Sequence, residues 1–522
     1  MHVSVRHLRR VAAAVLLLTG LAGATHAVLP RANAPVAAAP TDQAISEADL
    51  MQHIEVLASD AFEGRRAGTE GEQKTIAYIA KQFEALGAVP DGANGQWFQP
   101  VPLVERRPDK ATGKFKFESG SISLSSDALI ATTRDETLNM RKVPILFAGF
   151  GHQLDQVEVK DRLVLILSDK PSGGVAPLVM ADVRNSLAKR GAIGVMQVAP
   201  IDATWQRIRE LNRGPRTMLA NDPALAASII LPREQVDQMA QRVGRSLDSL
   251  IEEAGRADFR PLLLPVSFNL HATSIIRAYD GYNVVGRIRG RGGNGVGNLA
   301  GAIVLSAHHD HLGICAPKSG RDRICNGAVD NASGVAMMIE VGRRLNTGAP
   351  PERDVILIAT TAEELGLLGA RYYAGSLLGI KTEVVAALNM DTVAVVPRGA
   401  KIGVIGRGLT PLDPIIDKIA HDMGREVDDR LVHNALLRRQ DAWAFMQAGV
   451  PAVMVGGFFT DEARLKSFFD KPYHLPEDDL SQKIELGGAA QDADLMVRLA
   501  RTLADPALFP GNHPSETRLP PL

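Results

Sequence analysis

The sequence predicts an α/β protein in which a mainly parallel, mixed sheet is sandwiched by helices, with a separate β-rich insertion. From about residue 282 to residue 505, short and fully apolar stretches alternate with amphipathic stretches of helical spacing. That alternation is typical of strands buried on both faces by helices. Between about residues 106 and 265 short strand-like stretches dominate instead. A chain of 522 residues also exceeds one ordinary core, so we expect two or more compact units.

The first residues predict a signal peptide over residues 1–27. Arg6, Arg9 and Arg10 precede the apolar run 11–24, which is short for a membrane span, and small residues follow it. We therefore expect an exported protein, periplasmic or secreted, with no stable membrane insertion after cleavage, because no other stretch approaches transmembrane length. An uncleaved membrane anchor is the alternative interpretation.

The main domain is expected in two pieces, residues 45–105 and 275–508, on either side of an insertion at 106–265. The first piece should contain helices at 45–57 and 72–86, a loop at 59–71 and a strand at 100–105. In the insertion we expect strands at 143–151, 161–169, 191–199 and 227–232 and a helix at 183–190. The second piece predicts strands at 282–288, 302–307, 354–360, 383–390, 401–406 and 451–456, and helices at 334–345, 367–377, 411–423, 441–448 and 484–504.

Groups that can bind metal or transfer protons follow three of these strands. His308 and the next three residues, His309, Asp310 and His311, follow the first; Glu363 and Glu364 follow the second; Asp391 follows the third. Parallel sheets build sites beyond the carboxyl ends of their strands, so these groups are expected to meet. Asp330, just before a helix, and His474, in a loop, are two further candidates.

In these motifs the chain resembles peptidase family M28, the co-catalytic zinc aminopeptidases and glutamate carboxypeptidases. The resemblance is carried, in family order, by AHHDHLG, NGAVDNASG, TAEELGLLG, LNMD and YHLPEDD, and by the earlier segment LASDAFEGRRAGTEG. The stretches around 160–162 and 188–195 resemble the protease-associated domain that is inserted in several peptidase families. Residues 45–105 and 275–508 would then be the two parts of the peptidase domain.

The resemblance implies two Zn²⁺ per chain. It places His308, Asp330 and Asp391 on one ion, and Asp330, Glu364 and His474 on the other, with Asp330 bridging. Each ion then has one imidazole, two carboxylates and an open position for water, whose pKa the metals lower toward about 7.

The resemblance also implies three catalytic roles. Glu363 would be the general base that takes a proton from the metal-bound water and passes it to the leaving amine. Asp310 would hold the other ring nitrogen of His308, and Tyr473 would donate to the tetrahedral oxyanion.

Each residue also has a simpler interpretation. Strand alternation turns His309 away from His308, which favours a structural role, and we assign His311 no role. Glu363 and Glu364 would be favoured at any helix N-terminus, and Asp330 would serve as a capping residue. The set taken together favours the metal site, because its members occur in the expected context.

One segment departs from the family pattern. Many relatives carry a serine and a histidine around the aspartate that corresponds to Asp441, where this chain has Gln440 and Ala442. No zinc ligand is lost by this change, but a specificity carried over from relatives is in doubt.

Composition excludes some partners. Lys+Arg (58) balances Asp+Glu (59), so no basic excess suggests nucleic acid. The only two cysteines, Cys315 and Cys325, are most simply a disulfide in an exported protein. A metal-binding thiol pair is the weaker alternative, because the spacing fits no zinc-ribbon pattern.

The sequence therefore predicts an exported binuclear zinc aminopeptidase that acts on peptides. A glutamate-carboxypeptidase-like enzyme is the alternative within the class; it needs an arginine-rich pocket, for which Arg438 and Arg439 are the candidates. A glutaminyl cyclase is disfavoured by the full two-metal ligand set. A receptor-like scaffold on the same fold is the non-enzyme alternative, and all five ligands together with Glu363 argue against it. The oligomeric state is not predicted.

Overall fold

The computed structural model describes residues 44–169, 180–293, 301–315, 322–377 and 384–511. The predicted signal peptide, residues 1–27, lies outside them. Within the described ranges, no helix has both the length and the apolar character that a membrane crossing requires.

The sheet that carries the site is mixed and mainly parallel, as predicted. Its strand order is β16-β17-β15-β11-β14-β10, and β16 and β10 are the antiparallel members. The strands are β10 (Leu262–Ile288), β11 (Ala302–His308), β14 (Asp354–Thr360), β15 (Val384–Asn389), β16 (Gly403–Ile405) and β17 (Ala452–Gly456). Their apolar sequences are explained by burial of both faces.

Alternate residues of each strand contribute to two different cores. Ile303 and Leu305 of β11 pack into one core, with the helices α1 (Glu47–Leu57), α2 (Glu70–Ala85), α7 (Ser333–Asn346), α9 (Asp413–Asp422) and α12 (Gly487–Ala504). Val304 packs into the other, with α8 (Leu368–Ser376) and α10 (Ala442–Gln447). The helices therefore cover both faces of the sheet, which is the predicted sandwich.

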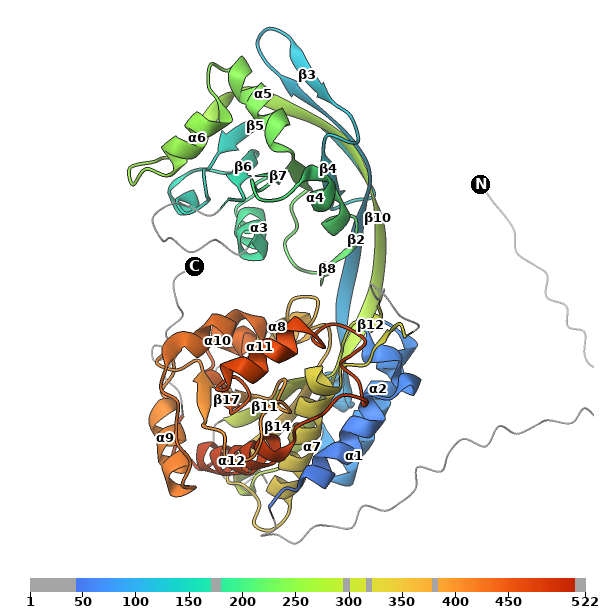
Figure 1. The fold of residues 1–522 in the computed structure, drawn as a ribbon, viewed down its shortest axis with the longest axis vertical. Helices are drawn as coiled ribbons and strands as arrows, with labels where there is room; N and C mark the ends of the chain where they lie inside the picture. The colour runs from blue at the N-terminus through green and yellow to red at the C-terminus, as the bar shows by residue number, and fades with distance from the viewer. Residues whose placement is uncertain (1–43, 170–179, 294–300, 316–321, 378–383, 512–522) are drawn as a thin grey trace, which may run out of the picture. The chain divides into compact units, whose positions relative to one another are not determined.

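A long antiparallel ribbon leads from this sheet into the insertion. β2 (Phe98–Lys116) and β10 pair from Phe98 opposite Val284 to Lys116 opposite Ser267, and they lie side by side in Figure 1. β2 is thus much longer than the strand predicted at 100–105. Its second half is polar, but it still pairs with β10, and its residues alternate between buried and exposed positions. The domain boundaries expected at residues 106 and 265 therefore fall inside β2 and β10.

The insertion continues the sheet in the order β10-β5-β6-β7-β9-β4. Its strands are β3 (Ser121–Leu124), β4 (Ile130–Thr133), β5 (Thr137–Phe147), β6 (Leu163–Leu167), β7 (Gly194–Val198), β8 (Arg216–Leu219) and β9 (Ala227–Leu231). Its helices are α3 (Met180–Lys189), α4 (Trp205–Leu211), α5 (Arg233–Arg242) and α6 (Leu247–Ala254).

Several elements were not predicted from the sequence. In the insertion only α3 was expected; α5, for example, is mostly polar and buries just Val236, Met239 and Ala240. α11 (Glu462–Asp470) and the 3-10 segment η6 (Leu431–Arg439) were also missed. Within the loop expected at 59–71 the chain forms the short 3-10 segment η1 (Asp60–Arg65). The missed helices α5, α6 and α11 have 10, 8 and 9 residues, and helices this short are hard to tell from strands by their apolar spacing.

Candidate metal centre

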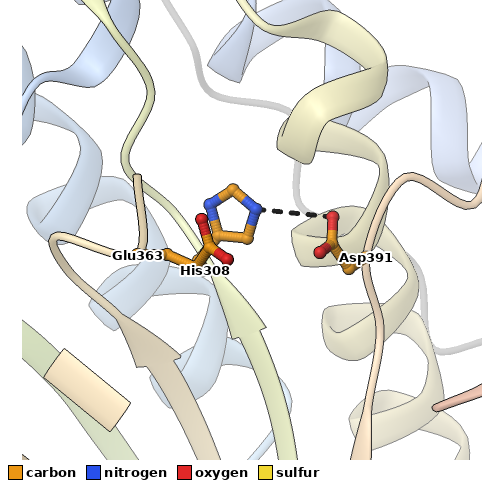
Figure 2. Close-up of side chains that lie close together, drawn as sticks. All are labelled: His308, Glu363 and Asp391. Carbon is orange, nitrogen blue, oxygen red and sulfur yellow. Dashed lines mark ion pairs between the residues drawn. The ribbon is translucent and has the colours of Figure 1, made fainter. Parts of the chain in front are cut away.

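Three strand ends bring the predicted residues together at one edge of the sheet. His308 is the last residue of β11 and pairs with Thr360 at the end of β14, while Ser306 pairs with Asn389 at the end of β15. Glu363 and Asp391 follow those ends directly. Figure 2 shows Glu363, His308 and Asp391 converging from these three segments.

The first group of donor atoms is centred on His308, which is buried. Its Nε2 lies 3.2 Å from Asp330 Oδ1 and 3.4 Å from Asp391 Oδ1. One donor atom each of His308, Glu363 and Asp391 lies within 4.8 Å of the others. Glu363 therefore borders the same ion position as the two predicted ligands.

The second group is centred on Glu364. Its Oε2 lies 3.0 Å from His474 Nε2, which is also 3.4 Å from Asp330 Oδ2. The two oxygens of Asp330 thus face the two groups, as a bridging carboxylate would. His311, which the sequence left without a role, is fully buried here, with Nδ1 2.7 Å from Glu364 Oε1. The only signal for it was its position in AHHDHLG.

These residues fit a pair of zinc ions. In the described part of the chain, four buried atoms of the second group lie close to one another but form no hydrogen bond of acceptable geometry: His311 Nδ1 and Nε2, Glu364 Oε1 and His474 Nε2. Buried polar atoms are normally satisfied, so their convergence points to a shared cation. Mixed imidazole and carboxylate donors are the set that zinc takes in catalytic sites.

The electrostatics of the site also favour cations. Burial lowers the pKa of His308, but the carboxylates of Glu363 and Asp391 outweigh it and raise that pKa well above its usual value. Burial raises the pKa of Glu363 well above its usual range; nearby His308 opposes this, and Glu364 adds to it. Several carboxylates thus share one buried space, an arrangement that divalent cations stabilise.

Backbone hydrogen bonds hold the turn that carries Asp330 in place. Its own N–H and that of Val329 donate to the carboxylate of Asp478, at 3.0 and 2.9 Å. The neighbouring Asn331 donates to the carbonyls of His308 and Met390, at 3.3 and 3.1 Å. These bonds fix the turn that carries Asp330 against the ends of β11 and β15. Asp478 belongs to the quoted YHLPEDD motif, but no role was predicted for it.

Arg65 is a buried residue that holds the backbone around the site in place. Only 1 % of this residue is exposed, and its guanidinium donates to the carbonyls of His309 (2.8 Å), Leu57 (2.8 Å) and Gly327 (2.9 Å). Burial lowers its pKa to about 10, against the raising effect of Asp478 and other site carboxylates, so it stays charged near neutral pH. It therefore ties α1 to the segments that follow β11 and precede Asp330.

Replacing Arg65 with alanine is expected to destabilise the protein by about 3 kcal/mol or more, because it leaves buried carbonyls without a donor. Urea unfolding of the purified variant measures the loss. Arg66→Ala is the matched control, since Arg66 is partly exposed and its ion pair with Glu105, at 3.6 Å, is a surface contact. Equal stability of the two variants would contradict this structural role.

The other predicted residues are placed as follows. His309 turns away and its Nε2 lies 2.9 Å from the Tyr282 carbonyl, in agreement with a structural role. The Nδ1 of His308 is nearer to the Asp310 backbone carbonyl (3.2 Å) than to its carboxylate (3.8 Å). That carboxylate accepts a hydrogen bond from the Glu363 N–H at 3.0 Å. The positioning role of Asp310 stays a prediction.

A small cavity of about 40 Å³ opens onto the first group. Its apolar walls are Ile405, Leu436, Met454, Phe458 and Phe469. Tyr473 also lines it; its hydroxyl accepts a hydrogen bond from Arg439 at 3.2 Å, and its ring stacks on His474. Burial raises the pKa of Tyr473, so its hydroxyl keeps the proton that it would donate.

Cys315 and Cys325 form the expected disulfide. It joins the two short strands β12 (Gly313–Ile314) and β13 (Ile324–Cys325), just before the turn that carries Asp330. The carbonyl of Cys325 and the backbone of Gly313 lie so close to Gly64 (φ +65°) that a side chain there would clash. This part of the site wall is therefore closely packed.

Comparisons with known proteins show which family part of the chain is similar to. Residues 283–500 match the sequence profile of peptidase family M28. The chain is 31% identical over 135 residues to a probable glutamate carboxypeptidase of Zea mays, which covers 25% of this chain and 17% of that protein. It is 45% identical over 67 residues to a probable zinc metalloprotease of Leptosphaeria maculans, 13% of this chain and 15% of that protein. The chain thus spans less than a fifth of the length of either relative.

Among solved structures, the fold is similar to an aminopeptidase from Aneurinibacillus sp. strain AM-1, with 19% identity, a TM-score of 0.49, and coverage of 88% of this chain and 94% of that one. The donor groups of the site and the match of residues 283–500 to peptidase family M28 indicate a protein of the metallopeptidase class.

Proposed function

We propose that the protein is a zinc-dependent exopeptidase with two zinc ions per chain, which removes N-terminal residues from peptides outside the cytoplasm. The observation that carries the proposal is the pair of donor groups that share the Asp330 carboxylate. Export rests on the N-terminal sequence, and the disulfide supports it, because disulfides persist in oxidising compartments.

His308, Asp330 and Asp391 would hold one zinc, and Asp330, Glu364 and His474 the other. When bound, the zinc pair polarises the scissile carbonyl and lowers the pKa of a coordinated water. Glu363 borders the first donor group, where this water would lie. Its raised pKa suits a group that takes a proton from the water and passes it to the leaving amine. The Tyr473 hydroxyl would donate to the oxyanion.

The preference for a free N-terminus rests on the resemblance to the co-catalytic aminopeptidases. It does not rest on the carboxylates of the site, because the charge of Asp330, Glu363, Glu364 and Asp391 would be offset by the two zinc ions. The apolar walls of the cavity beside the first donor group, which include Leu436, Met454 and Phe458, suit an apolar N-terminal side chain.

A panel of substrates tests the assignment. The purified protein is expected to cleave leucyl-arylamide and free-amine dipeptides, and to leave their N-acylated forms intact. Cleavage of N-acylated dipeptides with a free carboxylate would identify the carboxypeptidase alternative, which the name of the maize relative favours. Bound zinc without hydrolysis of any peptide would support the receptor-like alternative.

His311 is part of the proposed second zinc position. Its contact with Glu364 predicts that His311→Ala binds the second zinc about 10- to 100-fold more weakly, whether the ring ligates the metal or orients Glu364. Competition with a chelator measures the affinity. His421→Ala is the control, because the His421 side chain is 90% exposed. An unchanged zinc affinity in His311→Ala would exclude this role.

A further inference from the structure

A second and larger cavity borders the metal centre from the side of the insertion. It has a volume of about 390 Å³, and Glu364, Leu365 and Gly366 form one of its walls. The opposite walls come from β2, β4, α3 and the segment around β8. The cavity contains five arginines, Arg106, Arg134, Arg184, Arg216 and Arg371.

Only two of these guanidinium groups have a close carboxylate partner among the described residues. Arg371 pairs with Asp222 at 2.7 Å, and Arg134 with Asp135 at 2.9 Å. Arg106 instead donates to the Arg134 carbonyl (3.0 Å) and to Met218 Sδ (3.1 Å). The cavity therefore has an excess of positive charge.

Arg184 and Arg216 carry most of that excess. Arg216 donates to the neutral side chain of Asn212. In the described ranges, Arg184 has neither a hydrogen bond nor an ion pair from its side chain, and both residues are only partly exposed. Burial and, as the smaller cause, the nearby charge of Arg216 lower the pKa of Arg184 to about 10. Half-buried cations without a counter-charge are costly, so an anion bound between them would be stabilised.

The remaining walls indicate an organic ligand. Met218, Pro223, Leu225 and Leu368 line the same cavity. A small inorganic ion would make no contact with these apolar walls, whereas the carbon atoms of an organic ligand would. The two cavities also border different donor groups: the small one contacts His308 and Asp391, and the large one contacts Glu364. A peptide lying across both zinc positions would thus have its N-terminal side chain in the first cavity and continue into the second.

We propose that this arginine-lined cavity binds a carboxylate of the peptide substrate, on the leaving-amine side of the scissile bond, through Arg184 and Arg216. The proposal rests on the peptidase function proposed above and adds a substrate class to it: short peptides with a nearby C-terminal carboxylate, or peptides with an acidic residue after the cleaved bond. Both sources present the same planar anion, which guanidinium groups bind through paired hydrogen bonds.

Steady-state kinetics with Leu-Ala, Leu-Ala-amide and Leu-Glu-amide separate these sources. Arg184→Met keeps the length of the side chain and removes its charge, and Arg216→Met does the same. Each is expected to raise KM roughly 10- to 100-fold for the anionic substrate that the cavity recognises, and to change Leu-Ala-amide less than about twofold. Loss confined to Leu-Ala identifies the terminal carboxylate, and loss confined to Leu-Glu-amide the acidic side chain. Arg256→Met, on a side chain that is 61% exposed, is the control.

Equal effects on neutral and anionic substrates, or no effect on either, would overturn the proposal. Calorimetric titration with glutarate and with neutral glutaramide tests the cavity without catalysis. Glutarate is expected to bind the wild-type protein and Arg256→Met, and to bind Arg184→Met at least about 10-fold more weakly. If no peptide is cleaved but this pattern holds, the peptidase assignment fails while the anion site stands. If peptides are cleaved and glutarate binds all three proteins equally, the anion site fails alone.

Discussion

Replacing Glu363 with glutamine is expected to lower kcat/KM for leucyl-arylamide by roughly 10²- to 10⁴-fold while both zinc ions remain bound. The carboxamide keeps the size of the side chain but cannot take a proton from water. Glu363 lies after β14 at the border of the first donor group, close to His308 and Asp391. Stopped assays for activity and elemental analysis for zinc, on the same sample, give the two readouts.

The zinc content decides between two roles for Glu363. A large loss of activity with two zinc ions retained supports a general base. Loss of zinc in Glu363→Gln would instead make this residue a ligand, as its closeness to His308 and Asp391 allows. Activity equal to that of the wild type would exclude both roles.

Replacing Asp330 with asparagine is expected to weaken zinc binding more than about 100-fold and to abolish measurable hydrolysis. A residue outside the ligand set typically costs 10- to 100-fold in affinity, and Asp330 faces both donor groups, so its loss should affect both ions. Elemental analysis after dialysis measures the effect.

Asp322→Asn is the matched control for this variant. Asp322 lies just before β13, on the other side of that strand from Asp330; it is exposed and accepts a hydrogen bond from the Ile324 N–H at 2.9 Å. It should keep two zinc ions and full activity. Two tightly bound zinc ions in Asp330→Asn would refute the bridging arrangement.

The sequence predicted the part of the fold that positions the site, because the strands there are buried on both faces and therefore uniformly apolar. β11, β14 and β15 all begin and end within two residues of the predicted ranges. The residues at their ends also meet as expected, since neighbouring parallel strands finish at one edge.

Other features depend on contacts that a linear pattern does not contain. His311 was set aside because it lies beyond the strand, yet the turn after β11 returns it to Glu364. Arg65 sits in what was predicted as a loop, and only the fold places it under the site, against the carbonyls of His309 and Gly327. The arginines of the large cavity are far apart in sequence, so no motif marks them. Of the two candidates named from sequence, Arg439 lines the small cavity beside the first donor group, and Arg438 lies over the Trp443 ring.

Titrating zinc back into the chelator-treated protein, while recording hydrolysis of leucyl-arylamide, tests the central claim most directly. The proposed centre predicts no hydrolysis without metal and recovery that is complete at two zinc ions per chain. Recovery that is complete at one ion per chain, or hydrolysis that persists in the metal-free protein, would contradict a two-zinc peptidase.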